Sequence, residues 1–243
     1  MLFALALACA PKPAELPAET VELADPTPSV SSVDPEFQES HMSMHYTLLT
    51  SARDALIRGD MEGMREPMSW LATHDKHPGI PEEYLPYVQE LRGASRVAAN
   101  ATSVEAAAHG VATAAVICGE CHTRMSVGPR FEEEPALPDR KGVNWHMARH
   151  RWAADRMWEG MIQPSDTAWQ LGVAALQEDP LEAEELHAGM DMSSDEAKVA
   201  EWLHGMGEFG AHMEGSMARS AFYGEMLGNC SDCHSTMREA PAE

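Results

Sequence analysis

The chain has 243 residues and a formal net charge of −22, with 39 acidic and 17 basic side chains. This charge disfavours nucleic acids and anionic membrane surfaces as partners, because both would repel it. Hydrophobic residues make up 44% of the chain and aromatic residues 6%. Ala, Met, Leu and Glu dominate, which favours helices, and the length suits one large domain or two small ones.

The first ten residues are apolar and too short to span a bilayer, which is typical of the end of a secretory signal. Cys9 follows Leu5-Ala6-Leu7-Ala8, which is similar to a bacterial lipobox, although Leu7 stands at −2 where −3 is usual. Cleavage after Ala10, at an A-x-A site, is the alternative. Both interpretations predict export. Residues 11–36 contain six prolines among Ala, Glu, Ser and Thr, so we expect a disordered tether.

Past the tether, the turn residues and the hydrophobic pattern predict eight helices and no strands. The first four cover residues 36–58, 61–75, 81–101 and 103–126. After a proline-rich linker at 127–142, the other four cover residues 143–159, 164–178, 194–213 and 215–238. Eight helices with short loops predict an all-α fold of two tandem antiparallel four-helix bundles, at 37–126 and 143–238, with a tail at 239–243.

Two stretches read C-x-x-C-H, Cys118 to His122 and Cys230 to His234, and both lie late in their halves. This is the sequence by which a c-type haem is attached. On a helix, positions i, i+3 and i+4 share one face. Two thiols can therefore bond the two vinyl groups of one porphyrin while the histidine points its imidazole at the iron. The sequence predicts two covalently bound haem c groups.

Three other interpretations of the cysteines are open. A thioredoxin-like redox pair needs a strand followed by a helix, which the pattern lacks. Four cysteines and two histidines can hold zinc, but the two motifs lie far apart in the chain. Structural disulfides form in an oxidising compartment.

The chain also contains an internal repeat. His41-Met42-Ser43-Met44-His45 opens one half and His146-Met147-Ala148-Arg149-His150 opens the other, and both read H-M-x-x-H. Each half closes with C-x-x-C-H-x-x-M, ending at Met125 and Met237, at a similar distance from its opening motif. Two halves with matching ends predict two copies of one haem module.

The late position of the C-x-x-C-H motifs makes residues 37–238 resemble two tandem copies of class II c-type cytochromes, the cytochrome c′ family. Class I cytochromes, and the di-haem peroxidases built from them, carry the motif near the start. The resemblance implies one haem packed inside each bundle, with His122 and His234 as the proximal iron ligands. Carried onto this sequence, the covalent attachment points are Cys118, Cys121, Cys230 and Cys233.

The H-M-x-x-H motifs offer ligands for the other side of each iron. In an antiparallel bundle the start of the first helix lies beside the end of the fourth, and in low-spin members of the family this region supplies a Met ligand. We expect His45 and His150 as the distal ligands because they lie deeper in the helix, with Met42 and Met147 as alternatives. The other histidines are expected at the surface or in the core, among them His74, His77, His109, His204 and His212.

An occupied sixth position makes a haem an electron carrier, whereas an open one binds gases or catalyses. The sequence therefore predicts a periplasmic electron carrier that cycles between Fe(III) and Fe(II) and is not an enzyme. We expect redox proteins of the cell envelope as partners, with membrane contact only through lipid on Cys9, and the oligomeric state stays open. A gas-binding haem protein, a peroxidase-like enzyme and a non-haem metal or disulfide protein are the alternatives.

Overall fold

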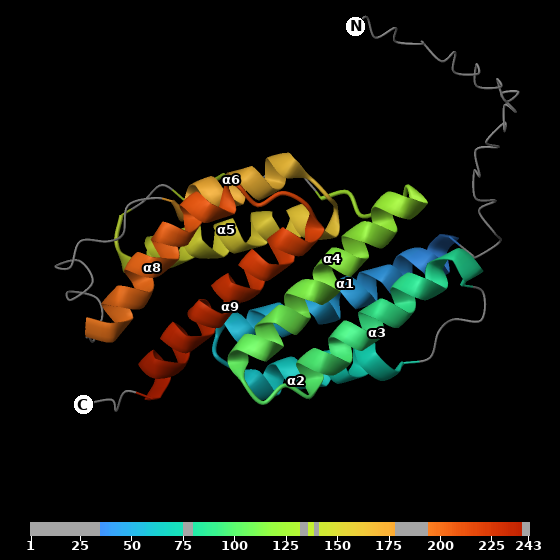
Figure 1. Cartoon of the computed structure of the whole chain (residues 1–243), viewed down its shortest axis with the longest axis horizontal. Coiled ribbons are helices and arrows are strands. Elements are labelled where there is room, and N and C mark those ends of the chain that lie inside the picture. The colour runs from blue at the N-terminus through green and yellow to red at the C-terminus, as the bar shows by residue number, and fades with distance from the viewer. Residues whose placement is uncertain (1–34, 75–79, 132–135, 139–140, 178–193, 240–243) are drawn as a thin grey trace, which may run out of the picture. The chain divides into compact units, whose positions relative to one another are not determined.

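The structure is a computed structural model that describes residues 35–74, 80–131, 136–138, 141–177 and 194–239 (Figure 1). Within these ranges the regular structure is α-helical apart from one 3₁₀ turn, and no strand occurs. The prediction of an all-α protein is therefore confirmed for this part of the chain. The predicted signal segment, Cys9 with its expected lipid and nearly all of the tether lie outside the described residues.

Four α-helices form the first half: α1 (Pro35–Ile57), α2 (Met61–Thr73), α3 (Leu85–Ala99) and α4 (Val104–Met125), with the 3₁₀ turn η1 (Glu82–Tyr84) before α3. Polar side chains cap the starts of α2 and α4. The Asp60 carboxylate accepts a hydrogen bond from the Gly63 N–H at 2.9 Å, and the Ser103 hydroxyl accepts one from the Ala106 N–H at 3.2 Å. These caps fix where α2 and α4 begin, close to the predicted starts.

The second half contains α5 (Val143–Ile162), α6 (Asp166–Leu176), α8 (Ser194–Gly210) and α9 (Ser216–Glu239). Helix ends agree with the prediction to within a few residues, but α5 continues through Gly160, where the sequence predicts its end. A Cβ on Gly160 would lie 2.9 Å from the backbone nitrogen of Trp169 in α6. Glycine at this position therefore allows α6 to pack closely and does not end the helix.

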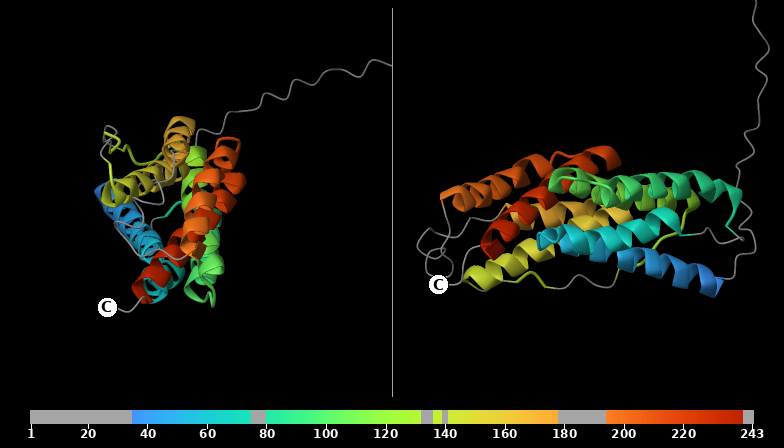
Figure 2. Two further views of the ribbon diagram at one scale, coloured as in Figure 1. Left: turned by 90° about the vertical axis from the view of Figure 1, so that its left-hand side faces the viewer. Right: turned by 90° about the horizontal axis from the view of Figure 1, so that it is seen from below.

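Neighbouring helices pack against one another within each half (Figure 1; Figure 2). In the first half α1 contacts α2, α2 contacts α3, α3 contacts α4, and α4 contacts α1. In the second half the same order of contacts joins α5, α6, α8 and α9. The start of α1 and the end of α4 lie at one end of the described helices, and the start of α5 and the end of α9 lie at the other (Figure 1).

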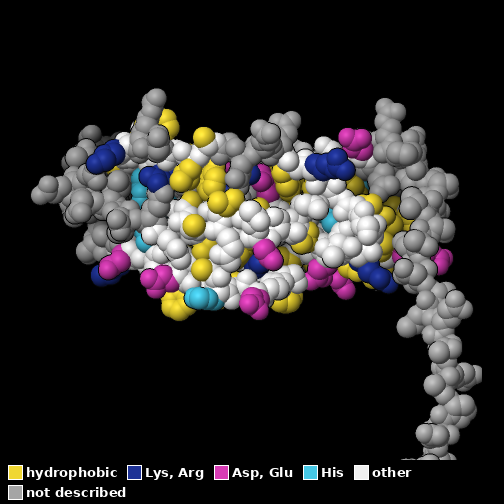
Figure 3. All heavy atoms as spheres, turned by 90° about the horizontal axis from the view of Figure 1, so that it is seen from above, with side chains coloured by type: hydrophobic (Ala, Val, Ile, Leu, Met, Phe, Trp, Pro, Cys, Tyr) yellow, Lys and Arg dark blue, Asp and Glu magenta, His cyan; other side chains and the backbone are white. Residues whose placement is uncertain are grey.

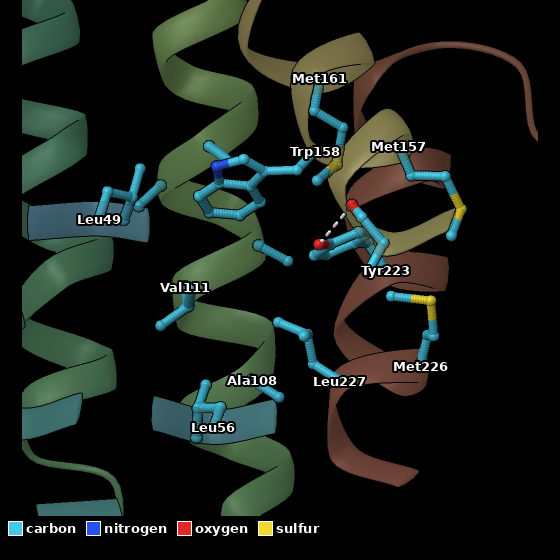
Figure 4. Close-up of a cluster of buried hydrophobic side chains, with 14 of the residues drawn as sticks. Leu49, Leu56, Ala108, Val111, Met157, Trp158, Met161, Tyr223, Met226 and Leu227 are labelled. Carbon is cyan, nitrogen blue, oxygen red and sulfur yellow. Dashed lines mark hydrogen bonds between the residues drawn. The ribbon is translucent and has the colours of Figure 1, made fainter. Parts of the chain in front are cut away.

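The two halves are joined by a shared core. The largest helix–helix interface of the described residues is between α4 and α9, and α1 also packs on α9 and α4 on α5. Figure 4 shows side chains of these four helices meeting, among them Leu49, Val111, Trp158 and Leu227. The Trp158 indole N–H of α5 donates a hydrogen bond to the Thr50 hydroxyl of α1 at 3.2 Å. All described residues accordingly belong to one compact unit.

Helix α4 is the most enclosed of the four. Five alanines between positions 107 and 115 are 0% exposed, and they point to several faces of the helix. They are the alanines at 107, 108, 112, 114 and 115. A Cβ on Gly110 would lie 2.8 Å from the Ala98 Cβ of α3. Small side chains let the backbones of neighbouring helices approach, so α4 can pack against α3 and α9 at once.

A buried ion pair also joins the two halves. Arg53 of α1 is 2% exposed, and its guanidinium lies 2.7 Å from Asp54 and 2.6 Å from Asp155 of α5. The same guanidinium lies over the Trp158 ring, 5.2 Å from its centroid. The carboxylates and Tyr223 raise the pKa of Arg53 despite its burial, so it stays charged.

The surface is mixed in character. On the face drawn in Figure 3, acidic and basic side chains are interspersed among apolar ones. Among the described helices, none combines the length and the apolar character that crossing a membrane requires.

Candidate functional site

The first C-x-x-C-H motif lies on the last turns of α4. Cys118 and Cys121 are half-buried thiols that form no disulfide. Burial raises the pKa of Cys118 to about 12 and that of Cys121 to about 11, so both thiols stay protonated at neutral pH. Their i, i+3 spacing places them on one helix face, beside His122 at i+4. Both sulfurs are thus available for bonds to a further group.

The imidazole of His122 is held by the second half of the chain. Its Nδ1 lies 2.7 Å from the carbonyl oxygen of Ile162, the last residue of α5. A carbonyl oxygen only accepts hydrogen bonds, so Nδ1 carries the proton and donates it. Burial lowers the pKa of His122, which favours the neutral ring. In a neutral ring with a proton on Nδ1, the Nε2 lone pair is available to a metal ion.

The second motif repeats this arrangement on α9. Cys230 and Cys233 are again half-buried thiols outside any disulfide, and burial raises the pKa of Cys230 to about 12. The Nδ1–H of His234 donates a hydrogen bond to the carbonyl oxygen of Ile57, the last residue of α1. His234 therefore also has its Nε2 available.

Each half thus orients the histidine that ends the C-x-x-C-H motif of the other half. We call His122 and His234 the motif histidines. Ile57 and Ile162 occupy the same position relative to the H-M-x-x-H motifs that open their halves. The two hydrogen bonds, to His234 and to His122, are therefore equivalent within the repeat. Histidines that bind metals almost always donate their second ring N–H to a carbonyl, a carboxylate or water, which fixes the ring and raises its basicity.

Glycines allow the close approach at both contacts. A Cβ on Gly119, the residue after Cys118, would lie 2.1 Å from the Met161 carbonyl oxygen. At the other contact Gly59 has a φ of +68°, and a Cβ there would lie 3.0 Å from the Ser231 carbonyl oxygen. The residue after the first cysteine of each motif therefore lies against the end of the other half's first helix.

A histidine cluster lies at the start of α1. The imidazoles of His41, His45 and His74, the first histidine cluster, offer one ligand nitrogen each, and these lie within 4.8 Å of one another. The Nε2 atoms of His45 and His74 are 2.9 Å apart. His74, at the end of α2, stacks on Trp70 with centroids 4.1 Å apart, and its Nδ1 is 3.1 Å from the Trp70 carbonyl. Burial, with His41 and His74 nearby, lowers the pKa of His45 to about 3.

The second half has a matching cluster. His146, His150 and His204, the second histidine cluster, also place one ligand nitrogen each within 4.8 Å of the others. The Nε2 atoms of His146 and His204 are 3.2 Å apart, and Nδ1 of His204 lies 3.1 Å from the Leu176 carbonyl. Burial lowers the pKa of His150 to about 3, with added effects from His146, His204 and His234. The motif histidine of α9 therefore lies near this cluster.

The expected distal ligands fall into these clusters. His45 lies in the first and His150 in the second, and the electrostatic effect of His234 on His150 places a proximal and a distal candidate in one neighbourhood. Of the alternatives, Met42 is 40% exposed and Met147 is half-buried. His77 and the side chain of Met237 lie outside the described residues.

Two cluster members were not expected as site residues. The sequence places His74 and His204 at the surface or in the core, and the structure places both in the clusters. For His74 a signal exists, because the end of a second antiparallel helix returns to the start of the first. His204 lies well inside α8, and nothing in the sequence relates it to His146.

A c-type haem fits these residues on two observations. Both motif histidines direct Nδ1–H to a carbonyl, at Ile162 and at Ile57, as metal-bound histidines do. In addition, Nε2 of His150 is buried without a hydrogen-bond partner. A buried polar nitrogen without a partner is unfavourable, and a bond to a metal would satisfy it.

Comparison with protein-family models, with curated proteins and with solved structures finds no match for this chain.

Proposed function

We propose that the protein is an exported c-type cytochrome with two haems, and that it carries electrons between redox proteins of the cell envelope. Cys118 and Cys121 attach one haem, and Cys230 and Cys233 attach the other. The haem, when bound, supplies an iron that cycles between Fe(III) and Fe(II). The role of the chain is to bind the iron on both sides, bury it and fix its ligands.

The proposal rests on the equivalent hydrogen bonds made by His122 and His234. In each half the histidine that completes C-x-x-C-H donates Nδ1–H to the last carbonyl of the other half's first helix. Nε2 of both rings is therefore available to bind a metal ion. Each ring lies on the same helix face as the two cysteines of its motif. A C-x-x-C-H sequence without a metal partner would not need the same nitrogen held in the same way twice.

We propose His45 and His150 as the sixth ligands. Their lowered pKa values keep both imidazoles neutral at neutral pH, as a nitrogen ligand must be. His150 has its Nε2 buried without a partner and lies near His234. An iron closed on both sides has no position for a substrate, which favours electron transfer over catalysis.

We propose that each half is a four-helix bundle with one haem. In each half, every helix contacts the next one and the fourth helix contacts the first, which supports this division. The resemblance to the cytochrome c′ family points the same way. The two bundles would share the α4–α9 interface and would not be independent domains.

The location and the partners follow from the same proposal. Haem is attached to c-type cytochromes outside the cytoplasm, so the chain is exported to the periplasm, and a lipid on Cys9 would tether it. The net charge of −22 favours a partner whose docking surface is basic.

The absorption spectrum of the reduced, periplasmically matured protein tests this function. With both sides of each iron closed, carbon monoxide should leave the Soret band unchanged. His150→Ala should open one iron and allow a carbon monoxide shift, while the matched control Met147→Leu should not. A carbon monoxide shift in the unmodified protein would instead support a gas-binding function.

A further inference from the structure

Each histidine cluster offers more ligands than one haem iron can accept. A porphyrin fills four positions around the iron and the motif histidine fills a fifth, so the protein needs to supply one further nitrogen. Each cluster presents three, from His41, His45 and His74 and from His146, His150 and His204. Two imidazoles in each half are left over.

The spacing of these nitrogens fits a single metal ion. Two nitrogens bound to tetrahedral zinc at ~2.0–2.1 Å lie about 3.3 Å apart. In the clusters, Nε2 of His45 and of His74 are 2.9 Å apart, and Nε2 of His146 and of His204 are 3.2 Å apart. The widest spacing in each cluster is no more than 4.8 Å, so small side-chain rotations bring all three nitrogens to one ion.

One histidine of each cluster is already oriented for metal binding. Nδ1 of His74 lies 3.1 Å from the Trp70 carbonyl, and Nδ1 of His204 lies 3.1 Å from the Leu176 carbonyl. Because a carbonyl only accepts, both rings carry the proton on Nδ1 and turn Nε2 toward the cluster. Neither hydrogen bond involves a residue that the haem proposal uses.

The third histidine of the clusters is not explained by the repeat. His74 lies at the end of α2, whereas His204 lies well inside α8, and the two positions do not correspond between the halves. Both nevertheless join an H-M-x-x-H motif. The two halves thus bring three imidazoles together by using different helices for the third one. This recurrence indicates that the function requires all three imidazoles.

We propose that each histidine cluster is a binding site for one divalent transition metal ion, such as zinc or copper, held by three imidazole nitrogens. Imidazole ligands favour these ions over magnesium or calcium. The metal sites themselves do not require haem. They share His45 and His150 with the proposed function, however, and resting on it we expect a bound metal ion to remove the sixth ligand from the iron.

Calorimetric titration of zinc chloride into the full-length matured protein tests the sites. Two zinc ions should bind per chain, His74→Ala should abolish one site, and His204→Ala should abolish the other. The control His212→Ala removes an exposed histidine and should keep both sites. No zinc binding, or two sites retained in both cluster variants, would overturn the proposal. Circular dichroism checks folding, and His74→Gln and His204→Gln replace any alanine variant that unfolds.

The absorption spectrum recorded during the same titration separates this inference from the proposed function. A Soret shift to a five-coordinate form as zinc binds supports both. Two zinc ions bound to a haem-loaded chain without a shift support the metal sites and count against His45 and His150 as sixth ligands. Two zinc ions bound to a matured chain that contains no haem support the metal sites and refute the proposed function. A haem-loaded chain that binds no zinc refutes the metal sites and leaves the proposed function intact.

Discussion

Gly119 offers a direct test of the contact by which one half orients the motif histidine of the other. Replacing it with alanine adds a Cβ that would lie 2.1 Å from the Met161 carbonyl oxygen and 3.1 Å from Cγ of Pro164. Both obstacles belong to the end of α5 or to the residues just after it. The backbone there must move, and the Ile162 carbonyl that accepts from His122 must move with it.

The expected effects have two parts. Overpacking a tight contact costs about 1–3 kcal/mol of the free energy of unfolding. Weakening the His122 hydrogen bond removes about 0.5–1.5 kcal/mol of interaction. If the whole loss falls on the Fe(III) state, the potential of the haem proposed at Cys118 and Cys121 should rise by about 20–65 mV, since 59 mV corresponds to tenfold for one electron. The haem proposed at Cys230 and Cys233 should keep its potential.

Urea denaturation and a spectroelectrochemical titration measure these two effects. Gly228→Ala is the matched control, because this glycine lies on α9 just before the second motif and a Cβ there meets nothing within 4 Å. The control should leave both potentials unchanged. If Gly119→Ala is as stable as the unmodified protein and shifts neither potential, the contact between the halves does not orient His122.

Three further predictions concern the packing of the helices within and between the halves. Arg53→Ala removes the buried partner of Asp54 and Asp155, which Arg151 still pairs, and should cost about 1.5–3 kcal/mol in urea denaturation; a loss below about 1 kcal/mol would mean that the pair acts like a surface one. Tyr223→Phe removes the second hydrogen bond to the Ala154 carbonyl, which the α5 backbone still pairs, and should cost about 0.5–1.5 kcal/mol; no loss would argue against that bond. A fragment of residues 37–138 exposes the face of α4 that packs on α9, so circular dichroism should show a less stable fold than the full chain has; equal stability would indicate independent bundles.

The helices were predictable from the sequence because their signals are local. Ser103 caps α4 and Asp60 caps α2 through their own side chains, and both starts can be inferred from neighbouring residues. Gly160 shows the limit of such signals. In the sequence it resembles a helix end, but its function is to admit the backbone of α6, which only tertiary packing reveals.

The candidate site was predictable in part for the same reason. The C-x-x-C-H and H-M-x-x-H motifs are short, so Cys118, His122, His45 and their counterparts could be named from spacing alone. The carbonyls of Ile57 and Ile162 carry no side-chain signal, since any residue has a carbonyl. His204 lies far from His146 in sequence and joins it only through the packing of α8.

The pyridine haemochrome assay detects covalently attached c-type haem and counts it per chain. Measured against protein concentration in the matured full-length chain, it should give two c-type haems per chain. The Cys118→Ala/Cys121→Ala and Cys230→Ala/Cys233→Ala variants should each give one. A colourless chain, or haem that acid–acetone extraction removes from the protein, would contradict the account.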